Sequence, residues 1–296
     1  CSSGRVGTLR RPGRTCGQRS LDRIPFPLLP WPSGRTYMTE EQAPAASPLP
    51  EIGRVTLGEL WICLKEGFVD FLLAPQYGLA FSAVYVVGGF LLVWLGAGTV
   101  SWTLTISLGF PLVAPFAAVG LYEVSRRIEA GLPLEWKPVI GVIWQERTRQ
   151  IPWMGAIIVI YLLFWTFLAH MIFAVFMGLS TAVNVTSSFE MFLTPEGLRM
   201  VAAEVIVGAA LAYLLFAMTL VSLPLLLEKE IDFVTAMLLS IRTVSENFVV
   251  LTIWALIIAV LSILALAPWF LGLMIVLPIL GHATWHLYRR ALYDPV

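Results

Sequence analysis

The chain has 296 residues, of which 58% are apolar and only 13% are charged. A soluble domain has about 45–50% apolar and about 25% charged residues. The composition therefore excludes an ordinary water-soluble enzyme, a disordered chain and a nucleic-acid-binding protein. The 19 basic and 19 acidic side chains cancel, but unevenly: residues 1–37 carry seven arginines and one acid, and the remainder is acidic.

Residues 1–50 are predicted to be disordered. Residues 1–37 contain five prolines and no methionine, and they lack the continuous apolar stretch of a secretory signal peptide. Their arginine richness resembles a mitochondrial transit peptide, but the prolines would break the amphipathic helix that such a peptide needs. The favoured interpretation is translated upstream sequence, with the native start at Met38.

Six windows along the chain are long and apolar enough to cross a bilayer, whose core of about 30 Å needs about 20 helical residues. The predicted spans lie near 77–98, 102–122, 152–177, 200–227, 248–267 and 269–288. The expected fold class is all-α: a polytopic membrane bundle of six transmembrane helices in one integral membrane domain, residues 51–293.

The distribution of basic residues predicts the orientation. With both termini inside, eleven lysines and arginines lie in the inner segments and only Arg199 lies in an outer loop. Positive residues concentrate on the cytoplasmic side of membrane proteins. The sequence therefore predicts a multi-pass protein of the bacterial cytoplasmic (inner) membrane, with the N-terminus and the C-terminus both inside.

Two segments have the pattern of interfacial amphipathic helices. In 55–74, polar residues recur at steps of three and four, which places them on one helical stripe. That stripe consists of Thr56, Glu59, Cys63, Glu66 and Asp70. The pattern predicts a helix in the inner interface, with its acidic face toward water or other polar groups. Residues 229–246 form a second such segment.

The second and sixth predicted spans share the pattern Gly-x5-Pro-x6-aromatic-x3-Arg-Arg, displaced by 163 residues. The first copy is Gly109, Pro115, Tyr122, Arg126 and Arg127, and the second is Gly272, Pro278, Trp285, Arg289 and Arg290. The favoured interpretation is an internal repeat of parallel orientation. The alternative is coincidence, because glycine, proline and terminal arginine are common in membrane helices.

The same positions carry a family resemblance. Ala114-Pro115 followed by residues 120–127 (GLYEVSRR), and Pro278 followed by residues 281–289 (GHATWHLYR), resemble the signatures of bacterial predicted integral membrane proteins of domain-of-unknown-function family 2189. The resemblance covers roughly 55–293. It implies an inner-membrane protein with no established activity. Some members carry a label from cytochrome c oxidase subunit I, which the three histidines of this chain do not support.

Two ionisable residues are predicted at membrane depth near the outer face. His170 lies before the outer end of the third span, and Glu204 lies about one turn inside the outer end of the fourth. Such residues are functional candidates by default. Paired, they would form either a proton or cation relay or a polar contact that fixes packing. The favoured interpretation is the polar contact that fixes packing.

A second polar group is predicted at the inner face. His282 and His286 are four residues apart and share a helical face. The cluster expected there comprises Asp70, Glu123, Glu228, Asp232, His282 and His286. His282, His286 and Glu123 are weak candidates for a divalent metal, and interface anchoring is the alternative. Haem is not expected, because His170 and His282 are roughly 15–18 Å apart at about 1.5 Å per helical residue.

Three functional hypotheses remain open. The first is a non-catalytic protein with a transport-related or lipid-related role. The second is an accessory or assembly factor of a larger membrane complex, such as a respiratory one. The third is a metalloenzyme that uses the inner cluster of histidines and carboxylates. Motif evidence for an enzyme is poor, and no cofactor is predicted. The expected partners are the lipid bilayer and other membrane subunits, with no nucleic acid.

Overall fold

The structure is a computed structural model, and it describes residues 49–94, 100–178 and 192–293, with the side chains of 92–114 left aside. These residues belong to one compact unit, residues 44–296. The predicted leader and the proposed start at Met38 lie outside the described residues, as does the side-chain environment of Gly109.

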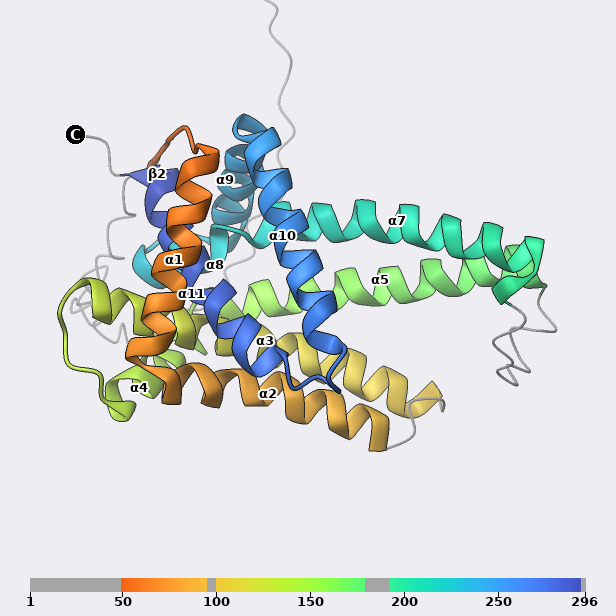
Figure 1. Cartoon of the computed structure of the whole chain (residues 1–296), viewed down its shortest axis with the longest axis horizontal. Helices are drawn as coiled ribbons and strands as arrows, with labels where there is room; N and C mark the ends of the chain where they lie inside the picture. The colour runs from red at the N-terminus through yellow and green to blue at the C-terminus, as the bar shows by residue number, and fades with distance from the viewer. Residues whose placement is uncertain (1–48, 95–99, 179–191, 294–296) are drawn as a thin grey trace, which may run out of the picture. The chain divides into compact units, whose positions relative to one another are not determined.

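The described chain is almost entirely helical, which confirms the predicted all-α class (Figure 1). The helices are α1 (Leu57–Leu73), α2 (Pro75–Trp94), α3 (Val100–Glu129), α4 (Trp136–Glu146), α5 (Ile151–Met177), α7 (Pro195–Thr219), α8 (Ser222–Glu228), α9 (Phe233–Glu246), α10 (Phe248–Leu266) and α11 (Leu273–Ala291). Two short strands, β1 (Glu51–Ile52) and β2 (Leu292–Tyr293), pair antiparallel and hold the two ends of this region together.

Three helical segments of the described chain are long and apolar enough to cross a membrane: α5, α7 continued by α8, and α10. They coincide with the predicted spans 152–177, 200–227 and 248–267. The segment formed by α1 and the described part of α2 would add a fourth, but the two helices meet at 102°. The structure therefore supports three or four spans, and the predicted count of six is not confirmed.

The predicted count of six spans and the three or four spans of the structure differ for two reasons. The predicted spans 77–98 and 102–122 extend into residues 92–114, whose side chains are not described. The predicted span 269–288 corresponds to α11, whose second half carries two histidines and ends in two arginines. Most of that half is buried against other helices, so protein covers the two histidines, while the two arginines at its end are partly exposed.

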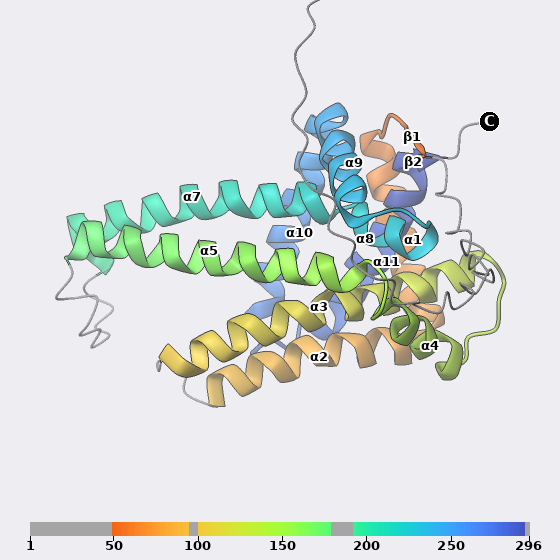
Figure 2. The same ribbon diagram turned by 180° about the vertical axis from the view of Figure 1, so that it is seen from behind.

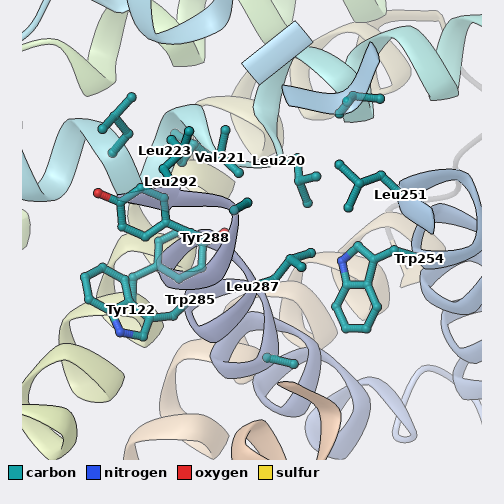
Figure 3. Close-up of a cluster of buried hydrophobic side chains, with 14 of the residues drawn as sticks. Tyr122, Leu220, Val221, Leu223, Leu251, Trp254, Trp285, Leu287, Tyr288 and Leu292 are labelled. Carbon is teal, nitrogen blue, oxygen red and sulfur yellow. The ribbon is translucent and has the colours of Figure 1, made fainter. Parts of the chain in front are cut away.

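α11 is the central helix of the described unit, because it contacts α1, α2, α3, α8 and α10. Its buried aromatic residues Trp285 and Tyr288 lie with Tyr122 of α3 and Trp254 of α10 in the main hydrophobic cluster (Figure 3). By contrast, α5 and α7 run side by side (Figures 1 and 2) and bury few residues along their length. Their uncovered apolar surface suits contact with lipid.

α1 begins at a capping box. The Thr56 hydroxyl accepts a hydrogen bond from the backbone N–H of Glu59, and the Glu59 carboxylate accepts one from the backbone N–H of Thr56. The helix then packs along α11 (Figure 1). The contact is close at Gly67, where a Cβ atom would lie 2.5 Å from the backbone nitrogen of Ala283. At Cys63, Glu66 and Asp70 the predicted polar stripe contacts polar side chains of α11, whereas Thr56 at its start is exposed.

This close approach makes a testable prediction. We expect Gly67→Ala to destabilise the fold by about 1–3 kcal/mol, because the added methyl group would overlap backbone atoms of α11 that cannot move aside. The measurement is thermal unfolding of the purified chain in detergent. Gly58→Ala is the matched control, since a Cβ at Gly58 would meet only the Thr56 hydroxyl at 4.0 Å. Equal unfolding temperatures for the two variants would contradict the close packing.

Candidate functional site

A chain of buried hydrogen bonds links α1, α3 and α11. Asp70 is only 4% exposed, and its Oδ2 atom accepts hydrogen bonds from Ser125 Oγ at 2.7 Å and from His286 Nε2 at 2.8 Å. Ser125 Oγ lies 2.8 Å from His282 Nδ1. The four side chains, His286, Asp70, Ser125 and His282, form a continuous chain that we call the polar relay.

The proton positions in the polar relay follow from its partners. Ser125 has one hydroxyl proton and donates it to the Asp70 carboxylate, so His282 Nδ1 is the donor in its contact with Ser125. A neutral His282 then carries a lone pair on Nε2. That atom is buried, with no hydrogen-bond partner among the described residues.

Glu66 and Arg290 flank the polar relay. Arg290 donates from Nη1 and Nη2 to the two carboxylate oxygens of Glu66, at 2.7 and 2.8 Å. His286 Nδ1 lies 3.5 Å from Glu66, so the imidazole lies between the carboxylates of Glu66 and Asp70.

A second group of polar contacts holds the end of α11. Arg289 donates to Glu129 of α3 at 3.2 Å and to Glu228 of α8 at 2.9 Å. Trp285 Nε1 also donates to Glu129 at 2.9 Å, and the Tyr288 hydroxyl donates to Glu228 at 2.5 Å. α11 is thereby tied by charged hydrogen bonds to both neighbouring elements.

A cleft of about 590 Å³ opens beside these residues, and we call it the polar cleft. It is lined by Lys65, Glu66, Val69, Asp70, Ile128, Glu129, His286, Arg289 and Arg290. Charges of both signs therefore face one volume. Lys65 is exposed, and its ammonium group lies 5.5 Å from the centre of the Trp61 ring.

The structure does not assemble the predicted metal ligands. Glu123 is fully buried, but Arg126 and Arg127 each approach its carboxylate at 2.7 Å, so two neighbours on its own helix occupy it. Within the described ranges, no group of three or more His, Cys, Asp or Glu side chains could hold a metal ion. The predicted ligands Glu123, His282 and His286 therefore do not form a common metal site in the described part of the chain.

Asp232 also lies apart from the cluster predicted for it. It is exposed at the start of α9, where its carboxylate accepts a hydrogen bond from the backbone N–H of Thr235 at 2.9 Å. The Thr235 side chain and backbone N–H hold the pKa of Asp232 below its usual value. Of the residues predicted for the inner-face cluster, the structure therefore brings together Asp70, His282 and His286, while Glu228 belongs to the neighbouring Arg289 group.

The predicted pair of His170 and Glu204 lies on the adjacent helices α5 and α7. The two side chains are near enough to interact electrostatically, but in the described part of the chain they form no ion pair within 4 Å. His170 is exposed, and its Nδ1 donates to the Thr166 carbonyl of its own helix at 2.7 Å. For His170 and Glu204, both the proton- or cation-transfer interpretation and the packing interpretation stay predictions.

The two copies of the repeat signature end α3 and α11 in the same way, each with a buried aromatic residue and an arginine pair. The arginines differ in their partners. Arg126 and Arg127 bind Glu123 on their own helix, whereas Arg289 and Arg290 bind carboxylates of other elements. The parallel repeat stays a prediction.

Sequence reasoning missed three residues of the site: Ser125, Glu66 and Glu129. Ser125 lies inside the signature of residues 120–127, and Glu66 lies on the polar stripe of α1, so both were within recognised patterns. Glu129 follows the signature by two residues and had no pattern of its own. Each was missed because its partner is on another helix.

Together, the helical fold and the apolar helices define an integral membrane protein of the all-α class. The family model described as "Predicted integral membrane protein (DUF2189)" matches residues 103–228, which confirms the resemblance over this part of the chain, including the first signature. The second signature, at Pro278 and residues 281–289, lies outside the match. No curated protein and no solved structure matches the chain. The matched region contains Ser125, Glu129 and Glu228, while Asp70 and both histidines of the polar relay lie outside it.

The polar relay gives a second prediction. We expect Asp70→Ala to lower the free energy of unfolding by about 1–3 kcal/mol or more, because it leaves the donors of Ser125 and His286 without an acceptor. Denaturant unfolding in detergent measures the change. The control is Glu246→Ala, which breaks a more exposed ion pair with Arg242 and should cost less than about 1 kcal/mol. A smaller loss for Asp70→Ala than for the control would show that the relay does not stabilise the fold.

Proposed function

We propose that this chain is a non-catalytic integral membrane protein that binds a zwitterionic phospholipid through the polar cleft. The observation that carries the proposal is the cleft itself, in which cationic and anionic side chains face one volume beside an exposed apolar helix face. The proposal develops the first of the three functional hypotheses drawn from the sequence, that of a non-catalytic protein with a lipid-related role.

α1 supplies the apolar side of this site. Its polar stripe is engaged by α11, and its opposite face exposes large apolar residues, including Trp61 (61% exposed), Phe68 and Leu72. An amphipathic helix with such a face lies in the plane of the membrane interface. α1 would then place the polar cleft at the level of the lipid headgroups.

The charges of the cleft suit a headgroup of both signs. Lys65 has no ion pair among the described residues, so it is available to a phosphate oxygen, with Arg289 beside it. Glu66 and Glu129 could accept hydrogen bonds from a primary ammonium group. An ethanolamine phosphate carries both groups, whereas choline has no N–H donor and a glycerol phosphate has no cation.

The location and orientation form part of the same proposal. The Arg126–Arg127 and Arg289–Arg290 pairs lie in the last turns of α3 and α11, and Lys65, in the middle of α1, lines the polar cleft together with Arg289 and Arg290. Such a concentration of positive residues supports a bacterial inner membrane protein with this end, and both termini, toward the cytoplasm. The role of an accessory or assembly factor remains the alternative, and a co-purifying membrane subunit would favour it.

The lipid proposal is tested by native mass spectrometry of the detergent-purified full chain with phosphatidylethanolamine, phosphatidylcholine or phosphatidylglycerol. We expect preferential retention of phosphatidylethanolamine. Lys65→Ala and Glu129→Gln should each weaken it about three- to tenfold, which corresponds to roughly 0.7–1.4 kcal/mol.

Arg242→Ala serves as the control, since Arg242 is an exposed cation of α9 outside the cleft. Equal retention of the three lipids, or retention unaffected by Lys65→Ala, would overturn the proposal. Competition by soluble phosphoethanolamine separates headgroup recognition from adhesion of the acyl chains.

A further inference from the structure

His170 is an ionisable side chain on the outside of the apolar helix α5. It is exposed, and its Nδ1 atom donates to the Thr166 carbonyl of the same helix at 2.7 Å. Within the described residues, its second ring nitrogen, Nε2, has no hydrogen-bond partner. Ionisable residues in membrane-spanning helices almost always face the interior of a bundle and pair with another group, so an exposed one needs an explanation.

Glu204 lies beside His170, on the neighbouring helix α7. The two side chains are near enough to interact electrostatically, and α5 and α7 run side by side (Figures 1 and 2). His170 lies about 10 Å from the last residue of α5, and Glu204 lies about 14 Å from the first residue of α7, at about 1.5 Å per residue. The base and the acid are therefore at a similar depth along this pair of helices.

Exposed apolar side chains accompany both residues. Phe167 precedes His170 by three residues and is 67% exposed, and Val201 precedes Glu204 by three residues and is 37% exposed. Side chains three apart on a helix are neighbours. We call the surface formed by Phe167, His170, Val201 and Glu204 the hairpin face. Lipid chains could cover its apolar part, but they offer no hydrogen-bond partner to the acid and the base.

We propose that the hairpin face binds the same face of a second copy of this chain, with His170 of each copy paired with Glu204 of the other. Two copies inserted in the same orientation are related by a two-fold axis along the membrane normal, and such a rotation leaves depth unchanged. A base and an acid at similar depth on one face therefore meet their complements twice. This inference does not depend on lipid binding in the polar cleft.

The hydrogen bonding of His170 suits this pairing. Its Nδ1 atom already carries the proton that it donates to the Thr166 carbonyl, so Nε2 can share one further proton with a carboxyl group. Each dimer would contain two such pairs and would remove four ionisable side chains from contact with lipid. A different subunit would have to supply an acid and a base at the same depth, whereas a second copy carries both by symmetry.

The test exchanges the two charges between chains. The full chain is labelled at its C-terminus with a donor or an acceptor fluorophore, and energy transfer in dilute vesicles of phosphatidylethanolamine and phosphatidylglycerol measures association. We expect the wild-type chain to associate. His170→Glu and Glu204→His should each weaken association about tenfold or more, roughly 1.4 kcal/mol, because each variant places like groups opposite each other at both contacts.

A mixture of the two variants separates pairing between chains from pairing within one chain. His170→Glu leaves two carboxyl groups in its own chain, and Glu204→His leaves two imidazoles, so neither variant restores a pair internally. A mixed dimer has an acid opposite a base at both contacts. With the donor on one variant and the acceptor on the other, the mixture should therefore associate nearly as strongly as the wild type.

Arg199→Ala is the matched control, since Arg199 is an exposed charged residue of α7 that pairs at 3.9 Å with Glu196 of its own helix. It should leave association unchanged. Wild-type chains that stay monomeric would overturn the proposal and leave the hairpin face to lipid or to another subunit. A mixture of folded variants that associates no better than either alone would overturn it as well.

His170→Gln and Glu204→Gln keep the test decisive if a charge-exchanged variant fails to fold. Both substitutions preserve a polar side chain of similar size while removing the exchange of a proton between imidazole and carboxyl group. Each should weaken association in the same direction as the charge exchange. Wild-type association in both glutamine variants would contradict the pairing.

Discussion

The carboxylate of Asp70 is the group on which the arrangement of α1, α3 and α11 depends. It is buried, and it accepts hydrogen bonds from Ser125 of α3 and His286 of α11. A buried carboxylate without donors would be strongly unfavourable, so these helices can pack closely only with all of these groups in place. The close approach at Gly67 brings α1 near enough to α11 for the contact to form.

This constraint explains the unusual character of α11. A helix that touches five other helices can carry histidines and arginines in its second half, because each meets a protein partner. The same polar residues reduce its apolarity below that of α5, α7 and α10. The region around α11 is therefore organised by hydrogen bonds and ion pairs, whereas α5 and α7 present apolar surfaces suited to lipid.

Much of the fold follows from the sequence. The predicted spans 152–177 and 248–267 differ from α5 and α10 by one residue at one end, because continuous apolar runs of this length have few alternatives in a membrane. The helix predicted over 55–74 is α1, Leu57–Leu73, and its place in the membrane interface stays a prediction. The site was predictable only in part: Asp70 and His286 were expected together, but Glu123 is held by its own arginines and Asp232 caps α9.

By itself, the sequence determined the membrane environment, the helical class and the faces of the helices that carry polar residues, because these depend on composition and local periodicity. Only the tertiary structure decided which polar group meets which. His286 and Asp70 are 216 residues apart, and Ser125 and His282 are 157 apart. Periodicity specifies the face of a helix but not the helix that it will face, so hydrogen-bond partners at such separations are set by packing alone.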